Sequence, residues 1–225
     1  MRNQMAGKTK QADRDRLKRY HRLRETGIDL SGKIPEACSD FDTVLPKIAR
    51  TLGMSKGNQV LLEDEEEINF LIDFCFFEAL SVDTPTMAEQ YAAATANLTE
   101  LEQTYLAAGK QSYTSLFKVI ETQPAANSLV TVDLLSESDE PISILNVNLS
   151  KSAQPGHVIF SRLLPYEDFN AFSGMFAAFR DLSDRFLLKR YHIMKKRVKS
   201  DRDSVQKFVA CFKLHRRFGM TVRTR

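Results

Sequence analysis

Residues 113–165 read YTSLFKVIETQPAANSLVTVDLLSESDEPISILNVNLSKSAQPGHVIFSRLLP. Within this stretch, apolar and β-branched residues concentrate in four short runs, at 113–121, 129–135, 142–149 and 157–164. The breaks between the runs contain residues that favour turns, namely Pro124, Asp139-Glu140-Pro141 and Pro155-Gly156. Consecutive hairpins are the simplest arrangement of such runs. The stretch therefore predicts a four-stranded antiparallel meander or a small, strongly curved barrel at about 113–164.

Helical periodicity dominates the chain before this stretch. Residues 42–52 predict a short helix that Gly53 ends. The apolar segment 60–80, which opens with the acidic run Glu63–Glu67, predicts a largely buried helix with its acidic end at the positive pole of the helix dipole. After Pro85, an Ala- and Glu-rich helix is expected to run to Ala108.

The N-terminal residues are basic and include few apolar positions. Leu17, Tyr20 and Leu23 recur at helical spacing before Gly27. We expect a partly disordered start, a basic helix that ends at Gly27, and a loop that contains Pro35.

Helical spacing returns after the predicted strands. Phe169, Phe172, Phe176 and Phe179 recur at intervals of three or four, and we expect this helical segment to continue as a basic helix to about Lys199. A last helix is expected around its apolar face, which comprises Val205, Phe208, Val209 and Phe212. The fold class is therefore α+β, with a helical N-terminal half, a small β-domain and basic C-terminal helices.

Length and composition describe an ordinary globular protein. The chain has 225 residues, 43% of them hydrophobic and 27% charged, which excludes collagen-like, disulfide-scaffold and wholly disordered classes. No apolar run is long enough to span a bilayer, so we expect a soluble, cytoplasmic protein. We expect three segments: a basic arm at 1–27, an acidic helical domain with the small β-domain at 28–179, and basic helices at 180–225 that pack on it.

Several motifs in the middle of the chain resemble those of an uncharacterised bacterial family. They are Phe70-Leu71-Ile72-Asp73-Phe74, Thr84-Pro85-Thr86, Leu116-Phe117-Lys118-Val119, Val132-Asp133-Leu134-Leu135, and Pro155-Gly156 followed by Arg162-Leu163-Leu164-Pro165. Members of that family combine helices with a small β-domain. The resemblance covers about residues 60–180 and implies one continuous domain there, with no known activity.

Charge is distributed unevenly along the chain. Residues 1–25 contain nine Lys or Arg and three acidic residues, and residues 180–225 contain fifteen and four. The residues between them contain 8 basic and 22 acidic residues, although the whole chain carries a net charge of only +3. Two interpretations follow: the basic ends contact an external polyanion, or they pair with the acidic middle of their own chain.

The same pentapeptide, Leu-Lys-Arg-Tyr-His, occurs at both basic ends, at 17–21 and 188–192. Interleaved basic and aromatic residues are typical of sites for RNA or single-stranded DNA, in which cations contact phosphates and rings stack on bases. The alternative is a pair of ordinary amphipathic helices. The candidate nucleic-acid-binding residues are Lys18, Arg19, Tyr20, Arg22, Lys189, Arg190, Tyr191, Lys195, Lys196, Arg197, Arg216 and Arg217.

The sequence contains no recognisable motif for catalysis, a metal or a cofactor. The three cysteines lie far apart, no His-Glu-x-x-His occurs, and no Gly-rich phosphate loop follows a predicted strand. Consecutive acidic residues at 63–67 point around a helix instead of converging on a metal ion. We therefore expect no metal, cofactor or catalytic residue, while a catalytic site assembled from distant residues stays open.

Together these features predict a non-enzymatic protein that binds RNA or DNA through its basic terminal helices. The alternative is a protein-interaction adaptor whose basic ends pair internally with the acidic middle helix. A third hypothesis is contact with an anionic membrane surface through the basic helix 180–199.

Overall fold

The structure is a computed structural model that describes residues 2–57, 59–81 and 83–220, with side chains from residue 11 onward. Within these residues the chain is α+β, as the sequence predicts. The helices are α1 (Arg2–Ala37), α2 (Phe41–Leu52), α3 (Glu67–Phe77), α4 (Met87–Ala94), α5 (Glu100–Lys110), α6 (Leu149–Ser152), α7 (Asp184–Lys195) and α8 (Asp203–Phe218). The strands are β1 (Ser55–Lys56), β2 (Gln59–Val60), β3 (Tyr113–Gln123), β4 (Ser128–Asp133), β5 (Ile142–Leu145), β6 (Val158–Pro165) and β7 (Asn170–Phe179).

The β-domain is a closed barrel of five strands in the order β3-β4-β5-β7-β6. All neighbouring strands pair antiparallel except β5 and β7, which pair parallel. The interior is filled by seven buried apolar side chains, namely Phe117, Val119, Leu129, Ile144, Ile159, Leu163 and Phe172. A small five-stranded barrel is also the architecture of the OB-fold. The architecture alone implies no function.

The barrel has one strand more than the four predicted, because β7 was expected to be helical. β7 contains a bulge: Ser161 of β6 pairs with Phe176, whereas Leu163 pairs with Phe172. Gly174, with a φ of 110°, allows the bulged backbone. β7 is buried on both faces, because Phe172 packs in the barrel interior whereas Met175 and Phe179 pack in the main core, so its large apolar residues recur at intervals of three and four. This spacing imitates a helix.

Helices cover the outer face of β3, β6 and β7. The main core cluster joins Leu116 and Phe160 of these strands to Phe74 of α3 and Phe208 of α8. Consequently β6 is buried on both faces along most of its length. The same cluster extends from Leu23 to Leu214, across all three segments expected from the sequence.

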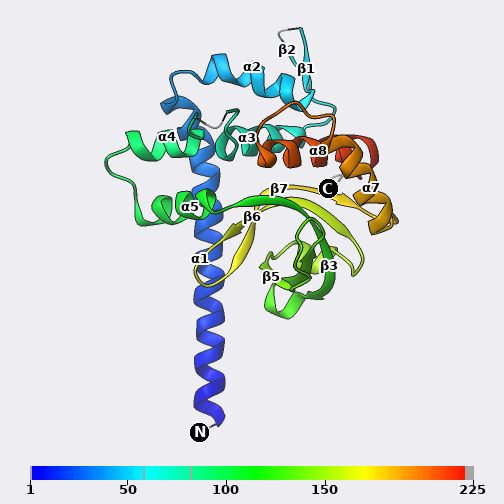
Figure 1. Ribbon diagram of the computed structural model, residues 1–225. Coiled ribbons are helices and arrows are strands. Elements are labelled where there is room, and N and C mark those ends of the chain that lie inside the picture. The colour runs from blue at the N-terminus through cyan, green and yellow to red at the C-terminus, as the bar shows by residue number, and fades with distance from the viewer. Residues whose placement is uncertain (1, 58, 82, 221–225) are drawn as a thin grey trace.

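The N-terminal helix differs most from its expected form. α1 continues through Gly27 to Ala37, and its N-terminal half extends away from the rest of the molecule (Figure 1). Gly27 does not end the helix. Instead it lies against the Tyr105 ring, and an added Cβ would come within 2.7 Å of that ring. Close helix packing, and not helix termination, therefore explains this glycine.

Three other elements refine the predicted boundaries. The helix expected over 60–80 begins at Glu67, because residues 59–60 form β2 and the acidic residues before Glu67 form turns. The helix expected up to Ala108 is divided into α4 and α5, since Thr99 begins a new helix with a capping box. α2 ends at Gly53 as predicted, with φ 79°.

Candidate functional site

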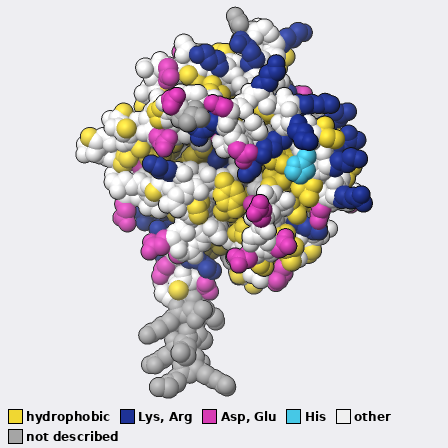
Figure 2. All heavy atoms as spheres, in the orientation of Figure 1, with side chains coloured by type: hydrophobic (Ala, Val, Ile, Leu, Met, Phe, Trp, Pro, Cys, Tyr) yellow, Lys and Arg dark blue, Asp and Glu magenta, His cyan; other side chains and the backbone are white. Residues whose placement is uncertain are grey.

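One side of α7 carries only basic side chains. Arg185, Lys189, His192 and Lys196 recur at intervals of four, three and four residues, so they lie along one side of the helix. All four are exposed, and among the described residues no acidic side chain forms an ion pair with them. We call this row the α7 face. Figure 2 shows Lys and Arg side chains gathered at the edge of the molecule where Figure 1 places α7.

The opposite side of α7 fixes the helix to the protein. Leu187 and Tyr191 are buried in the main core, and Met194 and Val198 pack against it. Ser183 caps the N-terminus of α7 by accepting a hydrogen bond from the Phe186 amide. The α7 face therefore presents its charges from a rigid helix.

The other basic residues predicted on this segment have different surroundings. Arg197 is exposed. The Arg190 guanidinium lies 5.2 Å from the centre of the Phe186 ring. Lys195 forms an ion pair with Asp203, which also pairs with Lys207 at 3.0 Å. Lys195 is therefore partly neutralised within the protein.

The two copies of the shared pentapeptide bury their tyrosine and expose their lysine and histidine. Tyr20 and Tyr191 are each 2% exposed, whereas Lys18 and Lys189 are exposed. Tyr20 packs edge-on against Phe169, at 6.2 Å between ring centres. The repeat thus matches two amphipathic helices that bury one tyrosine each. Its rings do not face solvent, so their burial does not support the expected stacking on bases.

The basic residues of α1 lie far from α7. Arg19 donates a 2.7 Å hydrogen bond to Asp168, while Lys18 and Arg22 are exposed. This part of α1 packs beside Phe169 and Ala171, at the start of β7, and α7 follows the other end of that strand. A ten-residue strand spans about 30 Å. The two basic segments therefore do not form one continuous surface.

The basic C-terminus is joined to the acidic segment before α3. Arg216 contacts Glu67 through two hydrogen bonds, of 2.6 Å from Nε and 2.7 Å from Nη2. Its Nη1 donates to the Gly53 carbonyl at 2.8 Å and lies 3.5 Å from Glu63. Glu67 is 1% exposed, so this pair is structural. Arg217, the neighbouring candidate, is exposed.

A buried ion cluster, which the sequence analysis missed, lies between the helices and the barrel. Arg162 of β6 is 1% exposed and donates to Asp73 at 2.7 Å and to Glu78 at 2.8 Å. Ser112 accepts a third hydrogen bond from it, and Ser173 donates to Asp73 at 2.6 Å. Two features of the sequence could have predicted this cluster: a lone arginine in an apolar strand and a lone aspartate in an apolar helix. Each requires a charged partner when it is buried.

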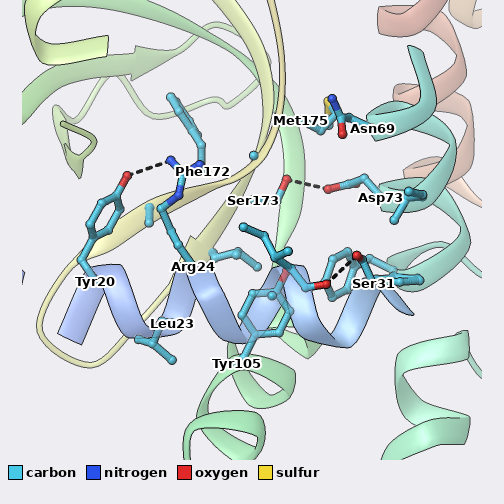
Figure 3. Close-up of a pocket in the computed structure, with 18 of the residues that line it drawn as sticks. Tyr20, Leu23, Arg24, Ser31, Asn69, Asp73, Tyr105, Phe172, Ser173 and Met175 are labelled. Carbon is cyan, nitrogen blue, oxygen red and sulfur yellow. Dashed lines mark hydrogen bonds between the residues drawn. The ribbon is translucent and has the colours of Figure 1, made fainter. Parts of the chain in front are cut away.

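A cavity of about 350 Å³ adjoins this cluster (Figure 3). Its walls come from α1, α3, α5 and the β6–β7 region, and they include Tyr20, Arg24, Asp73, Tyr105, Tyr166 and Ser173. Arg162 and Glu78 line a second cavity, of about 810 Å³. The ion cluster thus lies between the two cavities.

Among the described residues, potential metal ligands do not gather in one place and the thiols are buried. No group of three or more His, Cys, Asp or Glu side chains among them is arranged to hold a metal ion. All three cysteines are buried, and burial raises the pKa of the Cys75 thiol to about 12. No helix in the described part of the chain is long and apolar enough to cross a membrane.

Comparison with known proteins identifies a family but no activity. A family model described as a family of unknown function (DUF7986) matches residues 14–225. No curated protein and no solved structure matches the chain. The expectation of an uncharacterised family is confirmed, and the match extends well beyond residues 60–180. The chain belongs to this family of unknown function.

Proposed function

We propose that the protein binds single-stranded RNA or DNA through phosphate contacts on the α7 face. The observation that carries the proposal is a row of exposed Arg185, Lys189 and Lys196 on a well-anchored helix, without acidic partners among the described residues. Cations in such a row can each neutralise a phosphate and release its counterion. Exposed Arg197, at the same end of the helix, adds to this charge.

The charge of the barrel surface favours α7 as the contact site. In OB-fold barrels, oligonucleotides bind over the second and third strands and the neighbouring loops. Here the loop between β4 and β5 carries exposed Glu137, Asp139 and Glu140, and the loop after β6 carries exposed Glu167. These carboxylates would repel a phosphate backbone.

The test is a fluorescence-anisotropy titration of mixed-sequence RNA and DNA oligonucleotides. A triple variant, Arg185→Ala, Lys189→Ala and Lys196→Ala, removes the charge of the α7 face and keeps good helix formers. We expect it to bind at least about tenfold more weakly than the wild type at low salt.

The matched control removes exposed charge from the other basic helix, through Lys18→Ala and Arg22→Ala. We expect this double variant to retain most of the binding, because the basic part of α1 lies at the opposite end of β7 from α7. Equal losses in the two variants would indicate nonspecific attraction to net charge. Unchanged binding by the triple variant would remove the α7 face from the proposal.

The contacts of Arg216 favour a second candidate function, that of a protein-interaction adaptor whose basic ends pair with its own acidic residues. Arg216 holds Glu67 and approaches Glu63, so this part of the basic C-terminus pairs with the acidic middle. The adaptor predicts negligible oligonucleotide binding even at low salt, and a free energy of unfolding that falls as salt is added. Salt-sensitive oligonucleotide binding by the intact chain would contradict it.

A further inference from the structure

The cavity beside the buried ion cluster has a polar group without a partner. Tyr105 is 6% exposed and lines the cavity, and among the described residues no group forms a hydrogen bond with its hydroxyl. Gly27 makes room for this hydroxyl, since an added Cβ would lie 2.9 Å from the oxygen. Buried hydroxyls are normally hydrogen-bonded. The Tyr105 hydroxyl is therefore poised to bond with a molecule in the cavity.

Two sides of the cavity carry opposite charge. Figure 3 shows Arg24 and Tyr20 on one side, Asp73 and Ser173 on the other, and Tyr105 between them. Arg24 donates one hydrogen bond, of 3.2 Å, to the Tyr20 hydroxyl, and its remaining N–H groups can bind an anion.

The side formed by Asp73 has more carboxyl groups than cations. Asp73 and Glu78 share the single guanidinium of Arg162, so one carboxylate charge is not balanced within the ion cluster. Burial raises the pKa of Asp73, and the charge of Arg162 only partly opposes this effect. A cation at this side would stabilise the ionised carboxylate.

The bulge of β7 directs polar groups toward the same place. Ser173, Gly174 and Met175 lie in the bulge and line the cavity. Ser173 reaches Asp73 from there. Bulges often redirect side chains beside binding sites. The remaining walls include Phe76, Phe77 and Phe172, which would contact an apolar or aromatic group.

We propose that this cavity binds a small zwitterion of the amino-acid class, with its ammonium group on Asp73 and Ser173 and its carboxylate on Arg24. Tyr105 lies between the two sides, where its hydroxyl can donate to the carboxylate of the ligand or accept from its ammonium group. The phenylalanine walls contact the side chain of the ligand. A volume of about 350 Å³ suits a ligand of this size. The site is separate from the α7 face, so neither proposal depends on the other.

The experiment screens glycine and the nineteen other free L-amino acids against the full chain by saturation-transfer NMR, each at about 10 mM or at its solubility limit where that is lower, and measures affinity by calorimetry for those that bind. We expect at least one to bind, with its deaminated and decarboxylated analogues each at least about tenfold weaker. The absence of a signal from all twenty would overturn the proposal, as would an analogue that binds as well as the parent amino acid.

Three variants connect binding to the cavity. Arg24→Ala is expected to weaken binding by about tenfold or more, and Tyr105→Phe by about fivefold. Arg22→Ala is the matched control on the same helix, because Arg22 does not line the cavity. Tyr105→Phe should leave the stability of the unliganded protein unchanged or higher, since it removes a hydroxyl without a partner. Wild-type affinity in both cavity variants, or equal loss in the control, would overturn the assignment.

Discussion

Arginines in two regions of this protein have opposite environments. Arg162 is 1% exposed and is held by Asp73 and Glu78 in the buried ion cluster. Arg185, on the α7 face, is exposed and has no acidic partner among the described residues. Both directly precede apolar residues in the sequence, Leu163-Leu164 after Arg162 and Phe186-Leu187 after Arg185.

The difference teaches that the function of a basic residue depends on which charges the fold brings to it. A buried pair contributes to specificity of the structure, and removing one partner leaves an uncompensated charge. An exposed cation without a partner contributes little to stability and can bind an external anion. This distinction yields predictions that can be ranked by their effect on stability.

Removal of the buried Arg162 should lower the stability of the protein most. Arg162→Met leaves two carboxylates in the interior without a cation, so we expect the free energy of unfolding to fall by about 3–5 kcal/mol. Urea denaturation measures this change. Arg185→Met is the exposed control, with an expected change within about 0.5 kcal/mol. Similar changes in both variants would show that burial does not determine how much each arginine contributes to stability.

Removal of Arg216 should have an intermediate effect on the stability of the protein. Its side chain is 16% exposed, but its partner Glu67 is almost fully buried. We expect Arg216→Met to lower the free energy of unfolding by about 1.5–3 kcal/mol, the usual range for hydrogen bonds to a charged group. Arg217→Met, one residue further along α8, should change it by less than about 0.5 kcal/mol. A larger effect at Arg217 would contradict the contacts described for Arg216.

A smaller, pH-dependent effect is expected at Glu102, whose partner is the exposed Lys33. A hydrogen bond from Lys33, together with bonds from the Thr99 amide and hydroxyl, lowers the pKa of Glu102 to about 2. The folded protein therefore binds this proton more weakly than the unfolded chain, whose carboxyl has a pKa near 4.5. The resulting stabilisation is present above pH 4.5 and is lost as the pH falls toward 2.

Denaturation curves recorded between pH 5 and 2 check this prediction. The wild type should lose stability more steeply over that interval than Glu102→Gln, which cannot titrate. Parallel curves for the two proteins would mean that Glu102 has an ordinary pKa in the folded state.

The smallest change in stability is expected on the α7 face. The triple variant Arg185→Ala, Lys189→Ala and Lys196→Ala removes exposed cations without breaking an ion pair among the described residues. Thermal or urea denaturation should place it within about 0.5 kcal/mol of the wild type. A loss above about 2 kcal/mol would show that these cations have a structural role.

The sequence predicted the elements whose pattern is local. Turn residues such as Pro124 and Pro155-Gly156 separate β3, β4 and β6 as expected, and Gly53 ends α2. β7 was mistaken for a helix because it buries large apolar residues on both faces, in the barrel interior and in the main core, at intervals of three and four. Gly27 was mistaken for a helix end because its close contact with Tyr105 depends on α5, which is distant in sequence.

The candidate sites likewise could be predicted only where their residues are close together in the sequence. The basic character of α7 is visible in the sequence, but the ion pair of Lys195 with Asp203 requires the turn between α7 and α8. The ion cluster joins Asp73, Ser112, Arg162 and Ser173 from four separate elements or their ends. Only the lone charge in each apolar segment indicates such partners, and it does not identify them.

The salt dependence of oligonucleotide binding shows whether the α7 face contacts phosphates. The slope of log Kobs against log salt concentration is measured for the wild type and for the triple variant with the same single-stranded oligonucleotide. If all three cations contact phosphates, the magnitude of the slope should fall by about 2 in the variant, at about 0.7 for each contact to a single strand. An unchanged slope would contradict the account.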